Sequence, residues 1–117
     1  MIKFYGYSKW SSVRKAKAWL EENNLEFENI EIVKNPPSKE ELKEMYEVSG
    51  YELKKFFNTS GVKYRELGLK EVLKTATEEE MLELLASDGK LIKRPLLVTE
   101  NKVLIGFKEN EYKENLL

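Results

Sequence analysis

Near the start of the chain, the spacing of apolar residues changes from a period of two to a helical period. Apolar and polar side chains alternate over residues 2–5, which predicts a short strand that ends at Gly6. Apolar residues then recur at Val13, Ala16 and Leu20, with charged residues between them. This spacing predicts an amphipathic helix that directly follows the strand.

The boundaries of that helix and the element after it follow from short polar and alternating stretches. Ser8, Ser11 and Ser12 are candidate N-caps, and the Asn-Asn pair at 23–24 is expected to end the helix. Alternation over residues 30–33 predicts a second strand. A strand–helix–strand unit of this length predicts that the two strands are parallel, with a right-handed crossover.

The middle of the chain reads as helical. An Asn-Pro-Pro break at 35–37 precedes two capping boxes, in which a hydroxyl residue is followed three residues later by a glutamate: Ser38 with Glu41, and Thr77 with Glu80. The helices that they begin are expected to end near Gly50 and at the Asp-Gly pair 88–89. Shorter helical pieces are expected between them, with these apolar residues in the core: Leu53, Phe56, Phe57, Tyr64, Leu67, Leu69, Val72 and Leu73.

The last third of the chain predicts a hairpin and a final helix. Residues 96–99 and 102–105 are two apolar runs joined by Glu-Asn, and Asn110 is a candidate cap for a helix with Tyr112 and Leu116 facing inward. The order of elements predicts an α/β thioredoxin-like fold, with a four-stranded mixed sheet and a helical insert over about 38–90, between strands two and three. A length of 117 residues fits one domain, residues 1–117.

Charge and hydropathy narrow the classes of partner. Twenty basic and 21 acidic side chains give a net charge of −1, which lacks the single-sign field of most nucleic-acid and membrane-surface binders but leaves room for a local basic patch. The apolar stretch at the start is too short for a secretory signal, and no run of apolar residues is long enough to span a membrane. We expect a soluble, cytoplasmic protein that binds neither nucleic acid directly nor membranes.

The chain contains no cysteine and no histidine. This composition excludes a thiolate or Ser-His nucleophile, a zinc finger and an iron–sulfur cluster. The many glutamates fall on periodic helical faces, where a solvated surface explains them better than a metal site. No cofactor or metal is expected, and catalysis by serine or carboxylate would lack a suitable base.

Five stretches resemble the arsenate reductase-like (ArsC/Spx) family of bacterial thioredoxin-fold proteins, in family order and at family spacing. They cover nearly the whole chain and read FYGYSKWSSVRKAKAWLEE, NPPSKEEL, LKKFFNTSGVKYRELGLKE, LLASDGKLIKRPLLV and GFKENEY. In this family, a nucleophilic cysteine lies where the first strand runs into the first helix, often with a second cysteine three residues later. The helix terminus there stabilises a thiolate.

Those two cysteine positions hold Trp10 and Val13 here, and neither side chain can ionise or attack. Val13 is explained by packing, as the first member of the apolar stripe of its helix. Two readings of Trp10 stay open. The ring either packs next to the cap as a hydrophobic staple or serves as an anchor for a ligand or partner.

The resemblance also assigns three residues around the missing nucleophile. Arg14 matches an arginine close after the nucleophile, and Arg94 with Pro95 matches an Arg-Pro pair beside it, whose proline is the cis-proline of the fold. Two further oxyanion-binding arginines of the reductases correspond to Asn58 and Phe107, so the full arginine set is absent.

The remaining residues could still form an anion site. Ser11, Ser12 and Arg94 would combine hydroxyls, free backbone N–H groups and a guanidinium. In the alternative reading, the serines are only caps and Arg94 pairs with a surface carboxylate.

The sequence is compatible with two functions. The first is a redox-inactive binding or regulatory protein that contacts a protein partner or an oxyanion through the former active-site face; Spx-type relatives, which bind RNA polymerase, are the family example. The second is a glutathione- or thioredoxin-dependent thiol or arsenate reductase whose cysteines at 10 and 13 were replaced by engineering or misreading.

Overall fold

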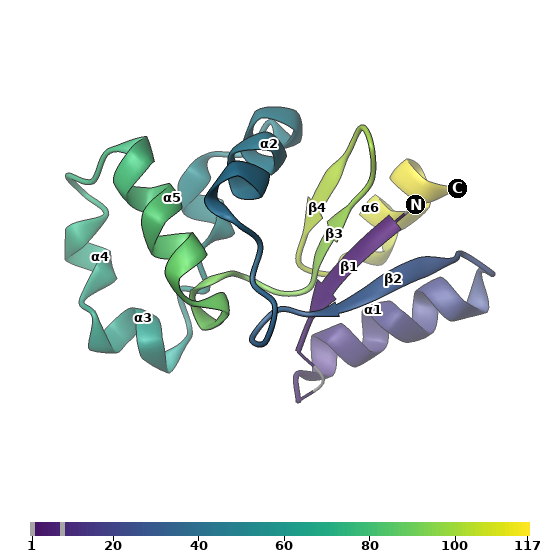
Figure 1. The fold of residues 1–117 in the computed structure, drawn as a ribbon. Helices are drawn as coiled ribbons and strands as arrows, with labels where there is room; N and C mark the ends of the chain where they lie inside the picture. Colours follow the sequence, from purple (N-terminus) through teal and green to yellow (C-terminus); the bar gives the residue numbers. More distant parts are fainter. Residues whose placement is uncertain (1, 8) are drawn as a thin grey trace. The chain divides into compact units, whose positions relative to one another are not determined.

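The computed structural model describes residues 2–7 and 9–117, and their contacts divide the chain into two compact units. The sheet unit comprises the chain up to Glu31 together with Arg94–Leu117, and the helical unit comprises Ile32–Lys93. Figure 1 shows the elements of each. That the two units form one domain stays a prediction, and each unit is described separately.

All four strands belong to the sheet unit. They are β1 (Ile2–Gly6), β2 (Phe27–Glu31), β3 (Leu96–Val98) and β4 (Val103–Ile105), in the order β2-β1-β3-β4. Strand β1 pairs with β2 in parallel, and β3 is antiparallel to both β1 and β4. The mixed four-stranded sheet, the parallel first pair and the hairpin are therefore confirmed.

The second strand lies three residues earlier than the alternation over 30–33 predicts. It occupies Phe27–Glu31, with Phe27 opposite Ile2. The Phe27 ring packs edge-on against Phe4 with 5.6 Å between centroids, and this contact anchors the earlier register. Ile32 is fully buried, but it belongs to the helical unit. Its apolar character therefore reflects burial in that unit and does not extend β2.

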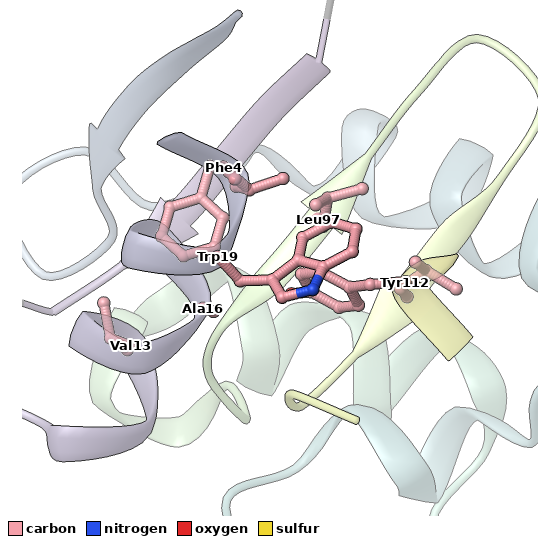
Figure 2. Close-up of a cluster of buried hydrophobic side chains, with 8 residues drawn as sticks. Phe4, Val13, Ala16, Trp19, Leu97 and Tyr112 are labelled. Carbon is pink, nitrogen blue, oxygen red and sulfur yellow. The ribbon is translucent and has the colours of Figure 1, made fainter. Parts of the chain in front are cut away.

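Helices α1 (Ser11–Glu22) and α6 (Glu109–Leu116) build the core of the sheet unit with one face of the sheet. Figure 2 shows the cluster, in which side chains from α1 meet Leu97 of β3 and Tyr112 of α6. The Tyr112 ring contacts Trp19 and Phe107 at 5.5 and 4.9 Å between centroids. Burial raises the pKa of the Tyr112 hydroxyl well above its usual value, so Tyr112 acts as a neutral packing residue.

The ends of these helices agree with the sequence only in part. Asn23 is the C-cap of α1 and Asn24 has a left-handed φ of 57°, which confirms the predicted end. The cap predicted at Asn110 is wrong, because the N-cap is Lys108, two residues earlier, and Asn110 lies within the first turn of α6. Tyr112 is buried, and the half-buried Leu116 packs against the same cluster, as expected.

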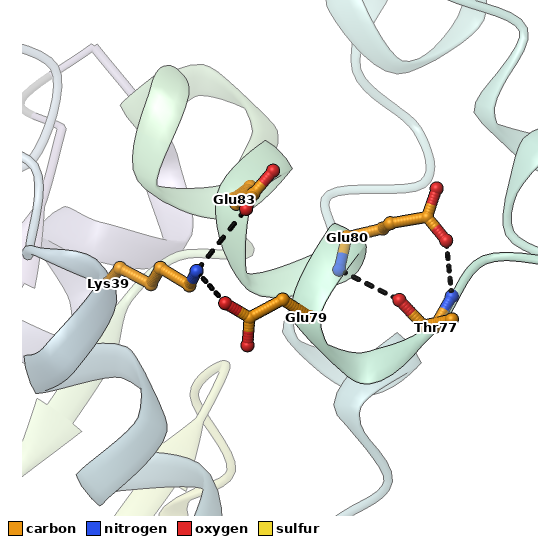
Figure 3. Close-up of polar contacts among 5 residues, drawn as sticks. All are labelled: Lys39, Thr77, Glu79, Glu80 and Glu83. Atoms are coloured by element: carbon orange, nitrogen blue, oxygen red, sulfur yellow. Dashed lines mark hydrogen bonds and ion pairs between the residues drawn. The ribbon is translucent and has the colours of Figure 1, made fainter.

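The helical unit contains four α-helices and two 3₁₀ helices among the described residues. They are α2 (Lys39–Ser49), η1 (Leu53–Phe56), α3 (Val62–Glu66), α4 (Leu69–Val72), α5 (Glu78–Ser87) and η2 (Gly89–Leu91). Both capping boxes are present, and Gly50 ends α2 in the left-handed conformation at φ 74°. Figure 3 shows the Thr77–Glu80 box and the contacts of Lys39 of α2 with Glu79 and Glu83 of α5.

Two of the residues predicted to lie in the core of this unit are exposed. Leu69 and Leu73 are buried, but Leu67 and Val72 are each 44% exposed. Gly68, at φ 61°, separates α3 from α4, so a single apolar stripe cannot continue across the two short helices. The prediction of short helical pieces is confirmed, and the prediction that all their apolar residues are buried is wrong.

The capping box of α5 gives a direct test of this unit. The Thr77 hydroxyl accepts a hydrogen bond from the Glu80 N–H at 3.1 Å. Thr77→Ala removes that acceptor and should lower the free energy of unfolding by about 1 kcal/mol. Chemical denaturation followed by circular dichroism measures the change. The control Thr75→Ala, at an exposed threonine outside the box, should be close to neutral, and equal losses for the two variants would contradict the assignment.

Candidate functional site

The junction between β1 and α1 is tightly packed. A Cβ added at the buried Gly6 would lie 2.6 Å from Cγ1 of Val13, so the last position of β1 leaves no room for a side chain. Val13 itself is 4% exposed and belongs to the same core cluster as Ala16 and Leu20. The packing interpretation of Val13 therefore agrees with its surroundings.

Trp10 is the N-cap residue of α1. Its backbone is extended, its N–H donates to the Tyr7 carbonyl at 3.0 Å, and its own carbonyl accepts from the Arg14 N–H at 3.2 Å. The indole makes no capping hydrogen bond. The predicted caps at Ser11 and Ser12 are therefore wrong, because both serines lie inside the first turn, and the candidate at Ser8 lies outside the described residues.

The indole instead faces Arg94. The guanidinium carbon of Arg94 lies 4.4 Å from the centroid of the Trp10 ring and 5.4 Å from that of the Tyr7 ring. Both distances fall within the range of cation–π attraction, in which the negative face of an aromatic ring stabilises a cation. Arg94 is only 4% exposed, and its pairing with a surface carboxylate stays an open alternative.

Pro95 fixes the backbone next to this arginine. The Arg94–Pro95 peptide bond is cis, which confirms the expectation from the resemblance. The Pro95 carbonyl accepts a hydrogen bond from the Gly106 N–H at 2.8 Å, just beyond the end of β4. The entry to β3, and with it the base of the Arg94 side chain, is thereby attached to the end of β4.

The other predicted site residues surround this group without joining it. Ser11 and Arg14 are exposed and Ser12 is half-buried, all within the first four residues of α1. An anion that approaches the two serines from solvent would reach the Arg94 guanidinium only if a covering side chain moved, because Arg94 is buried. The anion site of Ser11, Ser12 and Arg94 stays a prediction.

Tyr7 is the residue of this group that sequence reasoning missed. It follows Gly6 directly, is half-buried, and places its ring against the Arg94 guanidinium. The available signal was the run of aromatic residues in FYGYSKW on either side of the strand end.

Asn58 and Phe107, which stand where the reductases have further arginines, both have structural contacts. Asn58, in the helical unit, is 3% exposed; its Nδ2 donates to the Lys90 carbonyl at 3.4 Å, and its Oδ1 accepts from the Ser60 hydroxyl at 3.3 Å. Phe107, in the sheet unit, packs edge-on against Tyr112. Neither side chain can supply the positive charge that an oxyanion needs.

Other kinds of site find little support. Within residues 2–7 and 9–117, no three acidic side chains gather closely enough to hold a metal ion. The same residues include no helix of the length and apolar character that a membrane crossing requires.

The mixed sheet, the helix α1 that follows β1 and the cis-proline just before β3 define a thioredoxin-like fold, in a chain that contains no cysteine. The chain belongs to the ArsC family, whose sequence model matches residues 5–115.

Comparison with individual proteins supports this assignment. The chain is 60% identical to the Bacillus subtilis (strain 168) protein named "Uncharacterized protein YusI", over 97% of each chain. It superimposes with a TM-score of 0.94 on the crystal structure of a Bacteroides fragilis protein described as ArsC family related, at 53% identity over 97% of this chain and 95% of that one. It is also 32% identical to the Bacillus subtilis regulatory protein MgsR, over 94% of this chain and 86% of MgsR. Other matching structures carry arsenate reductase names.

The contact between Trp10 and Arg94 can be tested by changing the ring. Trp10→Phe keeps an aromatic face over the guanidinium, whereas Trp10→Leu keeps only apolar bulk. We expect the phenylalanine variant to be more stable than the leucine variant by about 1 kcal/mol, within the range of a partly desolvated cation–π contact. Urea unfolding followed by circular dichroism gives both values. Equal stabilities would show that the indole contributes only buried area.

Proposed function

We propose that this protein is a redox-inactive member of the ArsC family that works as a binding or regulatory protein through the face formed by Tyr7, Trp10 and Arg94. The observation that carries the proposal is the position of Trp10. It is the N-cap residue of α1, at the position where the resemblance expects the nucleophile, and its ring centroid lies 4.4 Å from the guanidinium carbon of Arg94. The loss of the thiol is thus accompanied by a new contact of a buried cation.

No residue of the chain can replace a cysteine thiol as the nucleophile of a reductase at this face. A thiol reductase forms and breaks a bond to sulfur through a thiolate, and the sequence contains no cysteine. It contains no histidine to activate a serine, and Val13, at the second cysteine position, is buried in the core. What remains is a pair of half-buried aromatic rings over the buried Arg94, and aromatic residues are enriched at the centres of protein interfaces.

The relatives favour a regulatory role. MgsR is named a regulatory protein, and more distant relatives from Listeria and Bacillus species are named global transcriptional regulators. We propose by analogy that this chain acts in the cytoplasm by contacting a protein partner, with an oxyanion as the alternative ligand of the same face.

The second candidate is a thiol or arsenate reductase whose cysteines at 10 and 13 were replaced by engineering or misreading. The arsenate reductase names of several structural neighbours and the cis Arg94–Pro95 bond favour this candidate. The codons at positions 10 and 13 in the encoding gene distinguish a natural replacement from a misread one.

Restoring the cysteines separates the two candidates. The chain as it stands should show no glutathione- or thioredoxin-dependent reduction of arsenate or of a small disulfide. The variant Trp10→Cys/Val13→Cys should gain disulfide reductase activity if the rest of the site is intact, because α1 again presents a thiol at its N-terminus. Coupled NADPH oxidation measures the turnover.

The control for that assay is Trp10→Ser/Val13→Ser, in which the new side chains are polar and close to cysteine in size but carry no thiol. Turnover by the unmodified chain above this control would overturn the proposal. Activity only in the cysteine variant would show a working scaffold whose chemistry has been lost.

A further inference from the structure

The charges of the sheet unit are sharply segregated along the chain. The first twenty residues contain five basic side chains and no acidic one: Lys3, Lys9, Arg14, Lys15 and Lys17. Residues 21–31 contain five glutamates and no basic side chain. The near-zero net charge of the protein therefore hides a run of basic residues in the part of the sequence that contains Trp10.

Three of these cations lie within five residues of Trp10 in the sequence and are exposed. Lys9 directly precedes Trp10 and is exposed, with its Nζ 6.0 Å from the centroid of the Tyr7 ring. Arg14 lies four residues after Trp10, a spacing that places two residues on the same side of a helix. Arg14 and Lys15 are both exposed. We call Lys9, Arg14 and Lys15 the basic rim.

The charges of α1 run against the preference of a helix. The helix dipole favours acidic residues in the first turn and basic residues in the last. Helices α2, α5 and α6 all have glutamates in their first turn, whereas α1 has none there and no basic residue in its last turn, where Glu21 and Glu22 lie. The arrangement of charges in α1 therefore lowers the stability of the helix. The requirements of folding do not explain this arrangement.

The contacts of the basic rim do not explain why these cations lie near the start of α1 either. Within residues 2–7 and 9–117, neither Lys9, Arg14 nor Lys15 forms an ion pair. The sheet register brings Glu31 opposite Gly6, at the same edge of the sheet, but one of its carboxylate oxygens is buried. The exposed charged residues that neighbour Trp10 in the sequence are therefore all basic.

We propose that this face binds an acidic segment of a protein partner, with Trp10 as the aromatic anchor and the basic rim pairing with carboxylates around it. The inference rests on the proposed binding function and names the chemistry of the partner. An aromatic residue flanked by complementary charges is the usual composition of an interface centre and its rim.

A short acidic peptide fits this surface better than a nucleic acid does. A nucleic acid requires a basic track that follows several successive phosphates. Here the basic rim is short, and β2, which pairs with β1 in the same sheet, presents the exposed carboxylate of Glu28, with exposed Glu26 just before it. Those carboxylates would repel a long polyanion but not a segment of a few residues.

The first experiment asks which peptides the face selects. A phage-displayed library of random twelve-residue peptides is panned on the full chain, and the enriched peptides are counted by net charge. We expect enrichment of peptides with a net charge of about −3 or below that also contain an apolar or aromatic residue. Enrichment of neutral or basic peptides, or no enrichment, would overturn the inference.

The second experiment places the binding at Trp10. The chain has two tryptophans, and Trp19 is buried in the core, so Trp19→Phe leaves Trp10 as the reporter. The most enriched peptide should change the emission of Trp10 in a saturable manner and bind more weakly as salt increases. A mixed-sequence single-stranded oligonucleotide and sodium sulfate at equal ionic strength should leave it unchanged. A stronger response to the oligonucleotide or to sulfate would reject the acidic peptide as the ligand.

Charge reversal separates recognition from stability. In this background, Arg14→Glu/Lys15→Glu should weaken peptide binding at least tenfold while leaving the melting temperature unchanged or raising it by about 1–4 °C, because the charges then agree with the dipole. The control Lys54→Glu/Lys55→Glu changes the net charge equally, at an adjacent exposed pair in η1 of the helical unit, and should bind as before. The milder pair Arg14→Gln/Lys15→Gln covers the case in which reversal disturbs folding.

The outcomes distinguish this inference from the proposed function. Peptide binding at Trp10 that resists the Arg14 and Lys15 changes would refute the acidic partner and leave the binding function intact. Reductase turnover by the unmodified chain would refute the binding function itself, whatever the peptides show.

Discussion

The close approach of α1 to the end of β1 is the constraint on which the site depends. Because Gly6 has no side chain, Val13 can fill the space above the last residue of the strand, where a Cβ would leave only 2.6 Å. That packing fixes the start of α1 and makes Trp10 its N-cap. A larger residue at position 6 would push α1 away from the strand and separate the indole from the guanidinium beneath it.

The burial of Arg94 makes an aromatic ring a favourable neighbour for it. A guanidinium that is 4% exposed carries a desolvation cost that must be offset by hydrogen bonds or by other favourable electrostatics. In a thiol enzyme, a thiolate nearby supplies negative charge. Here the electron-rich faces of Trp10 and Tyr7 supply part of that negative potential, without a group that can react. Arg94 is therefore stabilised in part by aromatic faces, in a chain that contains no cysteine.

The elements that depend on local sequence could be predicted, and those that depend on tertiary contacts could not. The capping boxes at Ser38 and Thr77 and the left-handed Gly50 follow from side chains within three or four residues of one another. The register of β2 depends instead on the distant contact of Phe27 with Phe4.

The same distinction applies to the site. The family resemblance located Trp10, Arg94 and the cis-proline, because these are positions within a shared pattern. It could not reveal that Trp10 would cap the helix in place of the serines, or that Tyr7 would lie against Arg94. Both facts depend on side-chain directions at the strand end, which no periodicity encodes.

The basic residues near the start of α1 have no thiolate to stabilise, because the chain contains no cysteine. In a family member with a thiolate at the helix start, nearby cations offset their unfavourable placement by stabilising the anion. The indole of Trp10 is neutral, and its face is already directed at Arg94. Arg14 and Lys15 are exposed, and no carboxylate of the described residues pairs with them. No ion pair within the described residues offsets their placement at the start of α1, and this supports the proposed interaction surface.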